Sequence, residues 1–411
     1  MTEFFDSLET RSTAEREADL FDAFPEKLTD IMNRIPGWKS RFAEIDISSI
    51  ANREALSKIP VMRKPELMDA QVENPPFGGF ADESLINGSR IFMSPGPIWE
   101  PQAPGPDPWQ AARAFHAAGL RAGDYVHCAI GFTMTPGGAI LDEGARALGA
   151  VTYPAGVGNT EAQVEAIAIL KPRCYAGTPD YLQTLIDKAE EMGKDISSIK
   201  LGMVSGGALF PSMRAAYKER GILVMQGYAT ADIGFIAHET QHEGEICEGM
   251  ICNENLILEI VRPGSDDPVR PGEVGEIVVT SFNKAYPLIR FGTGDMSAII
   301  EEPSPCGRTN MRIKGWMGRA DQRTKVKGMF VDPKQIGQLI KSVAGLENAR
   351  LVVSRDNGKD AMTLQAIGND LDPERIAEQF TVIAKLKGKV EIVETLPNDG
   401  KVIDDQRDYS G

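Results

Sequence analysis

Apolar residues at helical spacing mark the first part of the chain. One face of a helix with about 3.6 residues per turn would carry Leu20, Phe21, Phe24, Leu28, Ile31 and Met32, so a helical region is predicted over residues 12–45. Proline and glycine then dominate residues 74–108, which include Phe77-Gly78-Gly79-Phe80 and Ser94-Pro95-Gly96-Pro97. Because these residue types interrupt regular structure, this stretch is predicted to be loop.

Helical patterns and short apolar runs alternate over residues 109–235. The helical patterns cover residues 109–119, 138–148, 160–171, 180–192 and 211–220, and the apolar runs cover 125–131, 150–153, 173–176, 200–204 and 222–225. Strands that alternate with helices predict a mostly parallel sheet with helices on both faces. Ligands of such sheets bind outside the carboxyl ends of the strands, which is where candidate site residues are expected.

Strand patterns replace this alternation further along the chain. Residues 254–261 and 275–282 predict antiparallel strands of a smaller sheet. Residues 325–397 then read strand, helix, hairpin, helix and strand, an order typical of a split βαβ unit. The predicted fold is therefore α/β. A large N-terminal domain (1–318) has mixed and parallel sheets flanked by helices and a small antiparallel β subdomain, and a small C-terminal α+β domain covers 319–411.

Composition excludes several classes of protein. Of the 411 residues, 42% are hydrophobic and 25% charged, which is ordinary for a globular protein. No apolar run reaches the roughly 20 residues that span a bilayer, and the acidic N-terminus lacks a signal-peptide pattern, so a cytoplasmic protein with no membrane partner is expected. A net charge of −15 argues against a nucleic-acid partner.

Two short segments that follow apolar runs carry candidate chemistry. Ser205-Gly206-Gly207-Ala208 places two glycines at a strand end, where a flat ring or a backbone can approach closely. Gly227-Tyr228-Ala229-Thr230-Ala231-Asp232 offers a ring for stacking, a hydroxyl for phosphate and a carboxylate for Mg²⁺. Taken alone, each segment is more simply an ordinary turn.

Three further segments lie toward the C-terminus. Arg290-Phe291-Gly292-Thr293-Gly294-Asp295 ends in a carboxylate suited to two ribose hydroxyls, although a loop aspartate also satisfies backbone groups. Gly318-Arg319-Ala320-Asp321 falls at the expected domain boundary, where Asp321 could absorb a hinge rotation. Gly400-Lys401 puts a lysine after a flexible glycine, so its ammonium either reaches an anion or stays in solvent.

In this order and spacing, the five segments resemble the core motifs of acyl-adenylate-forming enzymes, and most closely those of the phenylacetate–coenzyme A ligases. Gly158-Asn159-Thr160-Glu161 and Cys306-Gly307-Arg308-Thr309 support the resemblance, which spans nearly the whole chain. It implies ATP-dependent activation of a carboxylic acid, typically aromatic, as an acyl-adenylate, with transfer to coenzyme A. It also implies Mg²⁺ and a C-terminal domain that rotates between the two steps. A homodimer is plausible.

The resemblance also implies a role for each motif residue. The catalytic residues would be Lys401, Thr230 and Asp232, with Lys401 reaching carboxylate and phosphate oxygens and the other two serving phosphate and Mg²⁺. The nucleotide-binding residues would be Gly206, Gly207, Ala208, Tyr228, Ala229, Asp295, Arg319 and Asp321, the last as the hinge. Gly131, Phe132 and Thr133 would border the acyl pocket.

One motif departs from the family pattern. The phosphate-gripping loop, Ser-Ser-Gly-Thr-Thr-Gly-Lys-Pro in the family, corresponds here to Ser94-Pro95-Gly96-Pro97-Ile98-Trp99-Glu100-Pro101. Two prolines remove backbone donors, and Glu100 would place negative charge where the triphosphate sits. Three interpretations stay open: a ligase with an unusual ATP grip, a protein that binds AMP, acyl-adenylate or acyl-CoA with weakened adenylation, and a silent regulatory protein.

Five widely spread cysteines do not predict a disulfide framework. Some members of the resembled family have a Cys/His cluster suited to zinc in this part of the chain, which implies His238, Cys247, Cys252 and Cys306 as candidate ligands here, with His242 nearby. The spacing is not a standard zinc pattern, and reduced thiols with surface histidines are the alternative. Any such zinc would be structural.

Overall fold

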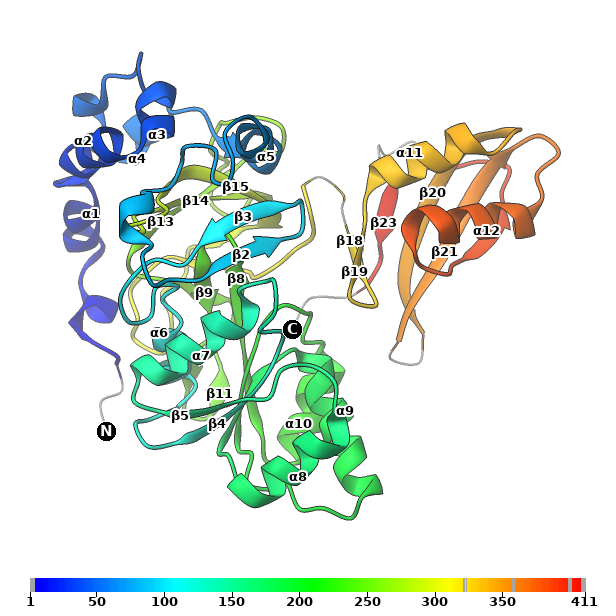
Figure 1. The fold of residues 1–411 in the computed structure, drawn as a ribbon, viewed down its shortest axis with the longest axis horizontal. Coiled ribbons are helices and arrows are strands. Elements are labelled where there is room, and N and C mark those ends of the chain that lie inside the picture. Colours follow the sequence, from blue (N-terminus) through cyan, green and yellow to red (C-terminus); the bar gives the residue numbers. More distant parts are fainter. Residues whose placement is uncertain (1–3, 321, 323, 357–358, 398–400, 408–411) are drawn as a thin grey trace. The chain divides into compact units, whose positions relative to one another are not determined.

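The chain folds into two compact units in a computed structural model that describes residues 4–320, 322, 324–356, 359–397 and 401–407 (Figure 1). Unit 1 comprises Met1–Thr293 and Ser297–Trp316, and unit 2 comprises Gly294–Met296 and Met317–Ser410. The described residues include no helix that is long and apolar enough to cross a membrane.

Short helices begin unit 1, as the apolar spacing predicts. They are α1 (Thr13–Phe21), α2 (Phe24–Arg34), α3 (Pro36–Arg41), α4 (Arg53–Leu56) and α5 (Lys64–Glu73), with 3₁₀ turns at Ser7–Thr10, Ile47–Ser49 and Glu83–Leu85. A capping box starts α1: the hydroxyl of Ser12 accepts from the backbone N–H of Glu15, whose carboxylate accepts from that of Ser12. The apolar faces of α1 and α2 are buried in the largest core of the unit.

The central sheet has nine strands in the order β16-β17-β12-β9-β8-β7-β6-β4-β5. Its parallel half consists of β4 (Tyr125–Ala129), β5 (Val151–Pro154), β6 (Cys174–Gly177), β7 (Leu201–Val204) and β8 (Leu223–Thr230). One face packs against α6 (Ala112–Ala117) and α7 (Gly137–Ala147), and the other against α8 (Thr160–Leu170), α9 (Pro179–Glu191) and α10 (Pro211–Glu219) (Figure 1). The predicted parallel sheet with two covered faces is confirmed.

Antiparallel strands continue this sheet and form a second one. The continuation consists of β9 (Gly234–His238), β12 (Met250–Cys252), β17 (Arg312–Ile313) and β16 (Ile299–Ile300), and β10 (Gln241–His242) and β11 (Glu245–Ile246) form a separate ribbon. The second sheet has the order β1 (Met62–Arg63), β15 (Leu288–Ser297), β14 (Gly275–Ser281) and β13 (Leu256–Val261). Because β1 runs beside β15, the start of α5 lies next to Phe291 and Gly292.

The proline- and glycine-rich stretch is not all loop, which corrects the prediction made for it. Residues Ile91–Ser94 (β2) and Ile98–Pro101 (β3) pair as an antiparallel hairpin, with Ser94 opposite Ile98. The side chain of Gln71 in α5 holds the hairpin, because it accepts from the backbone N–H of Trp99 at 2.8 Å and donates to its carbonyl at 2.9 Å. The strands β2 and β3 therefore pair despite the many prolines and glycines in this stretch.

Unit 2 is built on a four-stranded sheet in the order β22-β21-β20-β23. Its elements are β18 (Thr324–Val326), β19 (Met329–Val331), α11 (Pro333–Ser342), β20 (Leu346–Asp356), β21 (Lys359–Gly368), α12 (Pro373–Ala384), β22 (Lys389–Ile392) and β23 (Ile403–Asp405). The expected helix–hairpin–helix–strand order is present. The run before α11 folds back as the hairpin β18–β19, because Lys327 and Gly328 both take positive φ, and β23 occupies the edge beside β20.

Candidate functional site

Two predicted motifs meet at the carboxyl edge of the parallel strands. β7 and β8 are neighbours, so Gly206 and Gly207 after β7 lie beside the end of β8. Gly206 has φ +71°, a conformation that a side chain strains. Gly227 in β8 lies so close to β9 that an added Cβ would be 2.2 Å from the Phe235 ring. Glycine is therefore favoured at 206 by the backbone conformation and at 227 by the nearby Phe235 ring.

The turn from β8 to β9 carries the polar residues of the second motif. The Tyr228 hydroxyl donates to Thr293 Oγ1 at 3.3 Å, and the ring is 8% exposed. Thr230 Oγ1 accepts from the backbone N–H of Ile233 at 3.3 Å, next to a β-bulge at Ala229. The structure thus brings Tyr228, Ala229 and Thr230 beside the glycines, and their predicted roles stay proposals.

Asp232, the residue expected to bind Mg²⁺, is already paired with a lysine. Its Oδ2 lies 2.6 Å from Lys64 Nζ, and its side chain is completely buried. Lys64 is the first residue of α5, and its ammonium also lies 6.0 Å from the centre of the Phe291 ring. Sequence reasoning missed Lys64, because no motif contains it and 168 positions separate it from Asp232.

Glu100 points into the protein, which corrects the expectation that its charge faces a triphosphate. Glu100 is 3% exposed, and its Oε1 accepts a 2.8 Å hydrogen bond from Ser94 Oγ across the hairpin. Burial, followed by the neighbouring Asp232, raises the pKa of Glu100 well above its usual value. The neutral form of Glu100 is therefore favoured.

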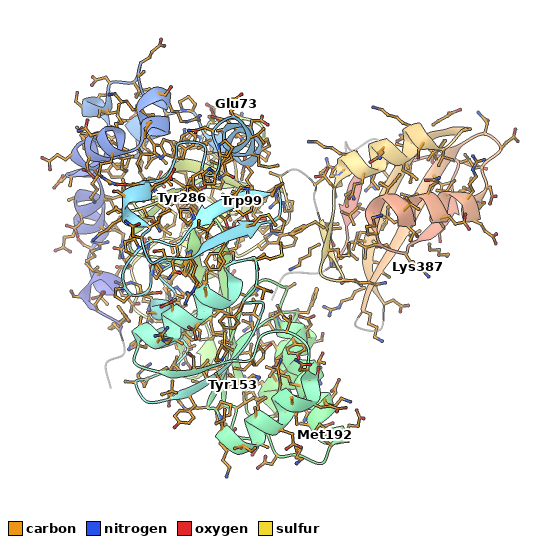
Figure 2. All side chains as sticks on the ribbon, in the orientation of Figure 1. Glu73, Trp99, Tyr153, Met192, Tyr286 and Lys387 are labelled. Carbon is orange, nitrogen blue, oxygen red and sulfur yellow. The ribbon has the colours of Figure 1, made fainter. Side chains whose placement is uncertain are left out.

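The buried side chain of Tyr286 lies near Glu100 and Asp232. The hydroxyl of Tyr286 (Figure 2) has no hydrogen-bond partner among the described residues, and burial, followed by Glu100 and Asp232, raises its pKa well above the usual value. Mg²⁺ requires several oxygen ligands in near-octahedral array. Asp232 Oδ2 is already bonded to an ammonium, and no group of three or more His, Cys, Asp or Glu residues in the described part of the chain could hold a metal ion, so the residues do not fit Mg²⁺ in this arrangement.

The predicted acyl-pocket segment adjoins the same hairpin. The backbone N–H of Met93 in β2 donates to the carbonyl of Met134 at 2.8 Å, one residue beyond Thr133. The Gly131 carbonyl accepts from Gly138 N–H at the start of α7, and Phe132 packs against the core under α7. Trp99 on β3, labelled in Figure 2, is 40% exposed. A backbone hydrogen bond therefore links the β2–β3 hairpin to the end of the predicted pocket segment.

In unit 2, Asp295 and Arg319 form an ion pair. Arg319 Nη1 donates to Asp295 Oδ1 at 3.0 Å, and the two residues also pair through their backbones. Gly294, with φ +75°, lets the guanidinium lie against the backbone, since an added Cβ would be 2.5 Å from Arg319 Nη2. The structure thus brings together two residues predicted for ribose binding. The predicted hinge, Asp321, lies outside the described residues.

Lys401 borders a small cavity of unit 2. Its Nζ lies 2.9 Å from Asp404 Oδ1, while Arg350 Nη2 lies 2.8 Å from Asp404 Oδ2. A cavity of about 190 Å³ is lined by Arg350, Lys401 and neighbouring residues that include Pro397. Burial raises the pKa of Asp404, but hydrogen bonds from Gln406, Lys401 and Arg350 outweigh it and hold that pKa well below the usual value.

The four predicted zinc ligands do not form one site among the described residues. His238 is opposite Ile251 in the β9–β12 pair, so Cys252, one residue further, points to the other face of the sheet. Cys306 Sγ donates to Thr240 Oγ1 at 3.3 Å, with Cys247 as a neighbour. Across the described ranges there is no group of three or more His, Cys, Asp or Glu residues that could hold a metal ion.

Comparison with known proteins adds independent findings. The family described as "AMP-binding enzyme" matches residues 145–285. The chain is 31% identical over 359 residues to the phenylacetate-coenzyme A ligase of Aromatoleum evansii, covering 83% of this chain and 78% of that protein. It is 29% identical over 380 residues to the protein of the same name from Escherichia coli (strain K12), covering 88% and 84%.

A solved structure shares the fold. A 2-hydroxyisobutyryl-CoA ligase, in complex with 2-HIB-AMP and CoA in the thioesterification state, matches with a TM-score of 0.81 at 22% identity. The match covers 99% of this chain and 93% of that chain. The predicted combination of mixed sheets, flanking helices and a smaller C-terminal unit is therefore confirmed as a fold.

Proposed function

Because the chain belongs to the AMP-binding enzyme family, alongside the phenylacetate–coenzyme A ligases, we propose that it activates a carboxylic acid as an acyl-adenylate and transfers the acyl group to coenzyme A. The family expected from the ordered motifs is thereby confirmed. In the first step, a carboxylate oxygen attacks the α-phosphorus of ATP and pyrophosphate leaves. In the second step, the coenzyme A thiolate attacks the acyl carbon and AMP leaves.

The observation that carries the proposal is the meeting of two motifs at the carboxyl edge of β7 and β8. Gly206 and Gly207 leave room for the adenine at this edge, where ligands of parallel sheets bind. Ala208 and Ala229 line the same edge. Thr230 supplies a hydroxyl to phosphate oxygens, and Tyr228 supports the adenine.

The residues of unit 2 have two roles in the proposal. Asp295 accepts hydrogen bonds from the ribose hydroxyls, and Arg319 fixes the orientation of its carboxylate. Lys401 places its ammonium on the reacting carboxylate and the α-phosphate during adenylation. Residues 319–411 act as a mobile domain for this purpose. Lys401 suits such a role because its side chain is 53% exposed and Asp404 keeps Arg350 as a second partner.

The proposed acid is aromatic. Two relatives carry the name phenylacetate-coenzyme A ligase, and Phe132 in the segment Gly131–Thr133 offers a ring beside the proposed pocket. The structural relative with an aliphatic acid in its name, 2-hydroxyisobutyryl-CoA ligase, makes the acid class the point to test. Phenylacetate, benzoate and 2-hydroxyisobutyrate form a panel that separates the two classes.

Pyrophosphate release and thioester formation test the proposal with that panel, ATP and coenzyme A. Lys401→Ala is expected to lower pyrophosphate release on the order of 100-fold, because a cation aimed at developing charge is lost. Lys387→Ala, a change at an exposed lysine of the same unit (Figure 2), is the matched control and is expected to keep full rate. AMP binding without turnover of any acid would instead support a binding protein with lost adenylation.

A further inference from the structure

We propose that Lys64 is a built-in cation that takes the place of a divalent ion at Asp232 and donates to the nucleotide phosphate. This inference deepens the proposed function and rests on it for the phosphate contact. The claim that the Lys64 ammonium takes the place of a metal ion beside Asp232 is tested on its own, because that test needs no nucleotide.

The contact between Lys64 and Asp232 leaves little room for a metal. Lys64 Nζ is 2.6 Å from Asp232 Oδ2, which is a full charge-assisted hydrogen bond. The carboxyl of Glu100, whose Oε1 is bonded to Ser94, is a close neighbour of Asp232. A divalent ion at Asp232 would have to displace the ammonium first.

Charge balance supports the same arrangement. The Asp232 carboxylate is completely buried and therefore requires a compensating positive charge. Lys64 provides this charge, because its ammonium lies 2.6 Å from Asp232 Oδ2. The Lys64–Asp232 pair is therefore balanced without a metal, and a divalent ion added to it would leave an excess of positive charge.

Lys64 is also the member of this group that a phosphate can reach. Its side chain is 25% exposed, whereas that of Asp232 is completely buried. An ammonium has three N–H donors, and Asp232 occupies one of them, so further donors remain for phosphate oxygens. Pro95 and Pro97 have no backbone N–H, so the turn between β2 and β3 lost donors that a lysine on α5 can replace.

A thermal-melting experiment with Mn²⁺ tests the cation position in the absence of nucleotide. Lys64→Met removes the charge at similar volume, and we expect millimolar Mn²⁺ to raise its melting temperature by several degrees, since the oxygens of Asp232 and Glu100 become available to a hard cation. The wild type and Lys58→Met, a change at a 72% exposed lysine before α5, should not respond. The double variant Lys64→Met/Asp232→Asn should lose the response.

The outcomes of this experiment decide the inference. A wild type stabilised by Mn²⁺ as much as Lys64→Met would show that a metal enters despite the lysine and would overturn the proposal. A Lys64→Met protein that is folded but does not respond would also overturn it. If Lys64→Met does not fold, Lys64→Gln, which keeps a hydrogen-bond donor, replaces it in the same measurement.

Calorimetry with AMP in EDTA tests the phosphate contact. Lys64→Met should weaken AMP binding roughly 10-fold relative to the wild type, and Lys64→Arg should restore most of it. Unchanged affinity in Lys64→Met would overturn the phosphate contact. A wild type that binds neither AMP nor ATP would overturn the proposed function together with this contact, whereas the Mn²⁺ response would still decide the cation position by itself.

Discussion

Two lysine–aspartate pairs in this protein have the same chemistry and opposite surroundings. Lys64 and Asp232 in unit 1 are 2.6 Å apart, and the aspartate is fully buried. Lys401 and Asp404 in unit 2 are 2.9 Å apart, but the lysine is 53% exposed and Arg350 holds the same aspartate. A buried pair is costly to break, whereas an exposed pair contributes little to stability. Lys64 therefore suits a fixed role and Lys401 a role that requires movement.

The largest difference between the two pairs is expected in the free energy of unfolding that is lost when each lysine is removed. Lys64→Met leaves a buried carboxylate uncompensated and is expected to lower the free energy of unfolding by about 3 kcal/mol. Lys401→Met is expected to change it by about 0–1 kcal/mol, because Arg350 stays with Asp404. Urea denaturation of both variants measures the two values. Equal losses would mean that burial does not distinguish the pairs.

The pH dependence of stability should differ in sign between the two surroundings. Glu100, beside Asp232, has a raised pKa in the folded state, so its stabilising contribution is complete below its usual value of 4.5 and is lost as pH rises through the raised pKa. Asp404 has a lowered pKa, so its contribution is present above its usual value of 3.8 and is lost as pH falls through the lowered one.

Two neutral variants isolate these effects, each of which is at most about 1.4 kcal/mol per pH unit. Glu100→Gln should flatten the decline in melting temperature on the alkaline side. Asp404→Asn should flatten the decline on the acid side, in addition to weakening the fold. Melting curves from pH 3 to pH 9 compare both with the wild type. A Glu100→Gln profile parallel to that of the wild type would contradict the raised pKa.

Regular patterns made much of the fold predictable from the sequence. The alternation of helical and apolar patterns over residues 109–235 corresponds to the elements from α6 to β8, because each element carries its own period. The hairpin β2–β3 was not predicted, since pairing between Ile91–Ser94 and Ile98–Pro101 depends on register and on Gln71, which local composition does not show. Turn composition indicated where regular structure is interrupted but not how strands pair.

The residues of the candidate site likewise include some that the sequence could identify and some that it could not. Gly206, Tyr228 and Asp295 could be identified because they lie in short segments with a recognisable order. Lys64 could not, because its role depends on a tertiary contact brought about by the pairing of β1 with β15. The zinc set failed for a related reason: spacing along the chain does not show that His238 and Cys252 face opposite sides of a sheet.

The smallest predicted effect concerns the hairpin that covers the buried pair. Gln71→Ala removes two hydrogen bonds to the backbone of Trp99 and should lower the free energy of unfolding by about 1–2 kcal/mol. A loosened β3 would also admit water to Glu100 and Asp232, so the alkaline decline attributed to Glu100 should become shallower as its pKa moves toward the usual value. Gln183→Ala, at a half-buried glutamine whose side chain donates a solvent-exposed hydrogen bond to Asp187, is the control for losing a glutamine side chain. If Gln71→Ala weakens the fold but leaves the alkaline decline as steep as in the wild type, the hairpin does not exclude water from Glu100 and Asp232. The burial of Asp232 would then depend on β8, β9 and α5.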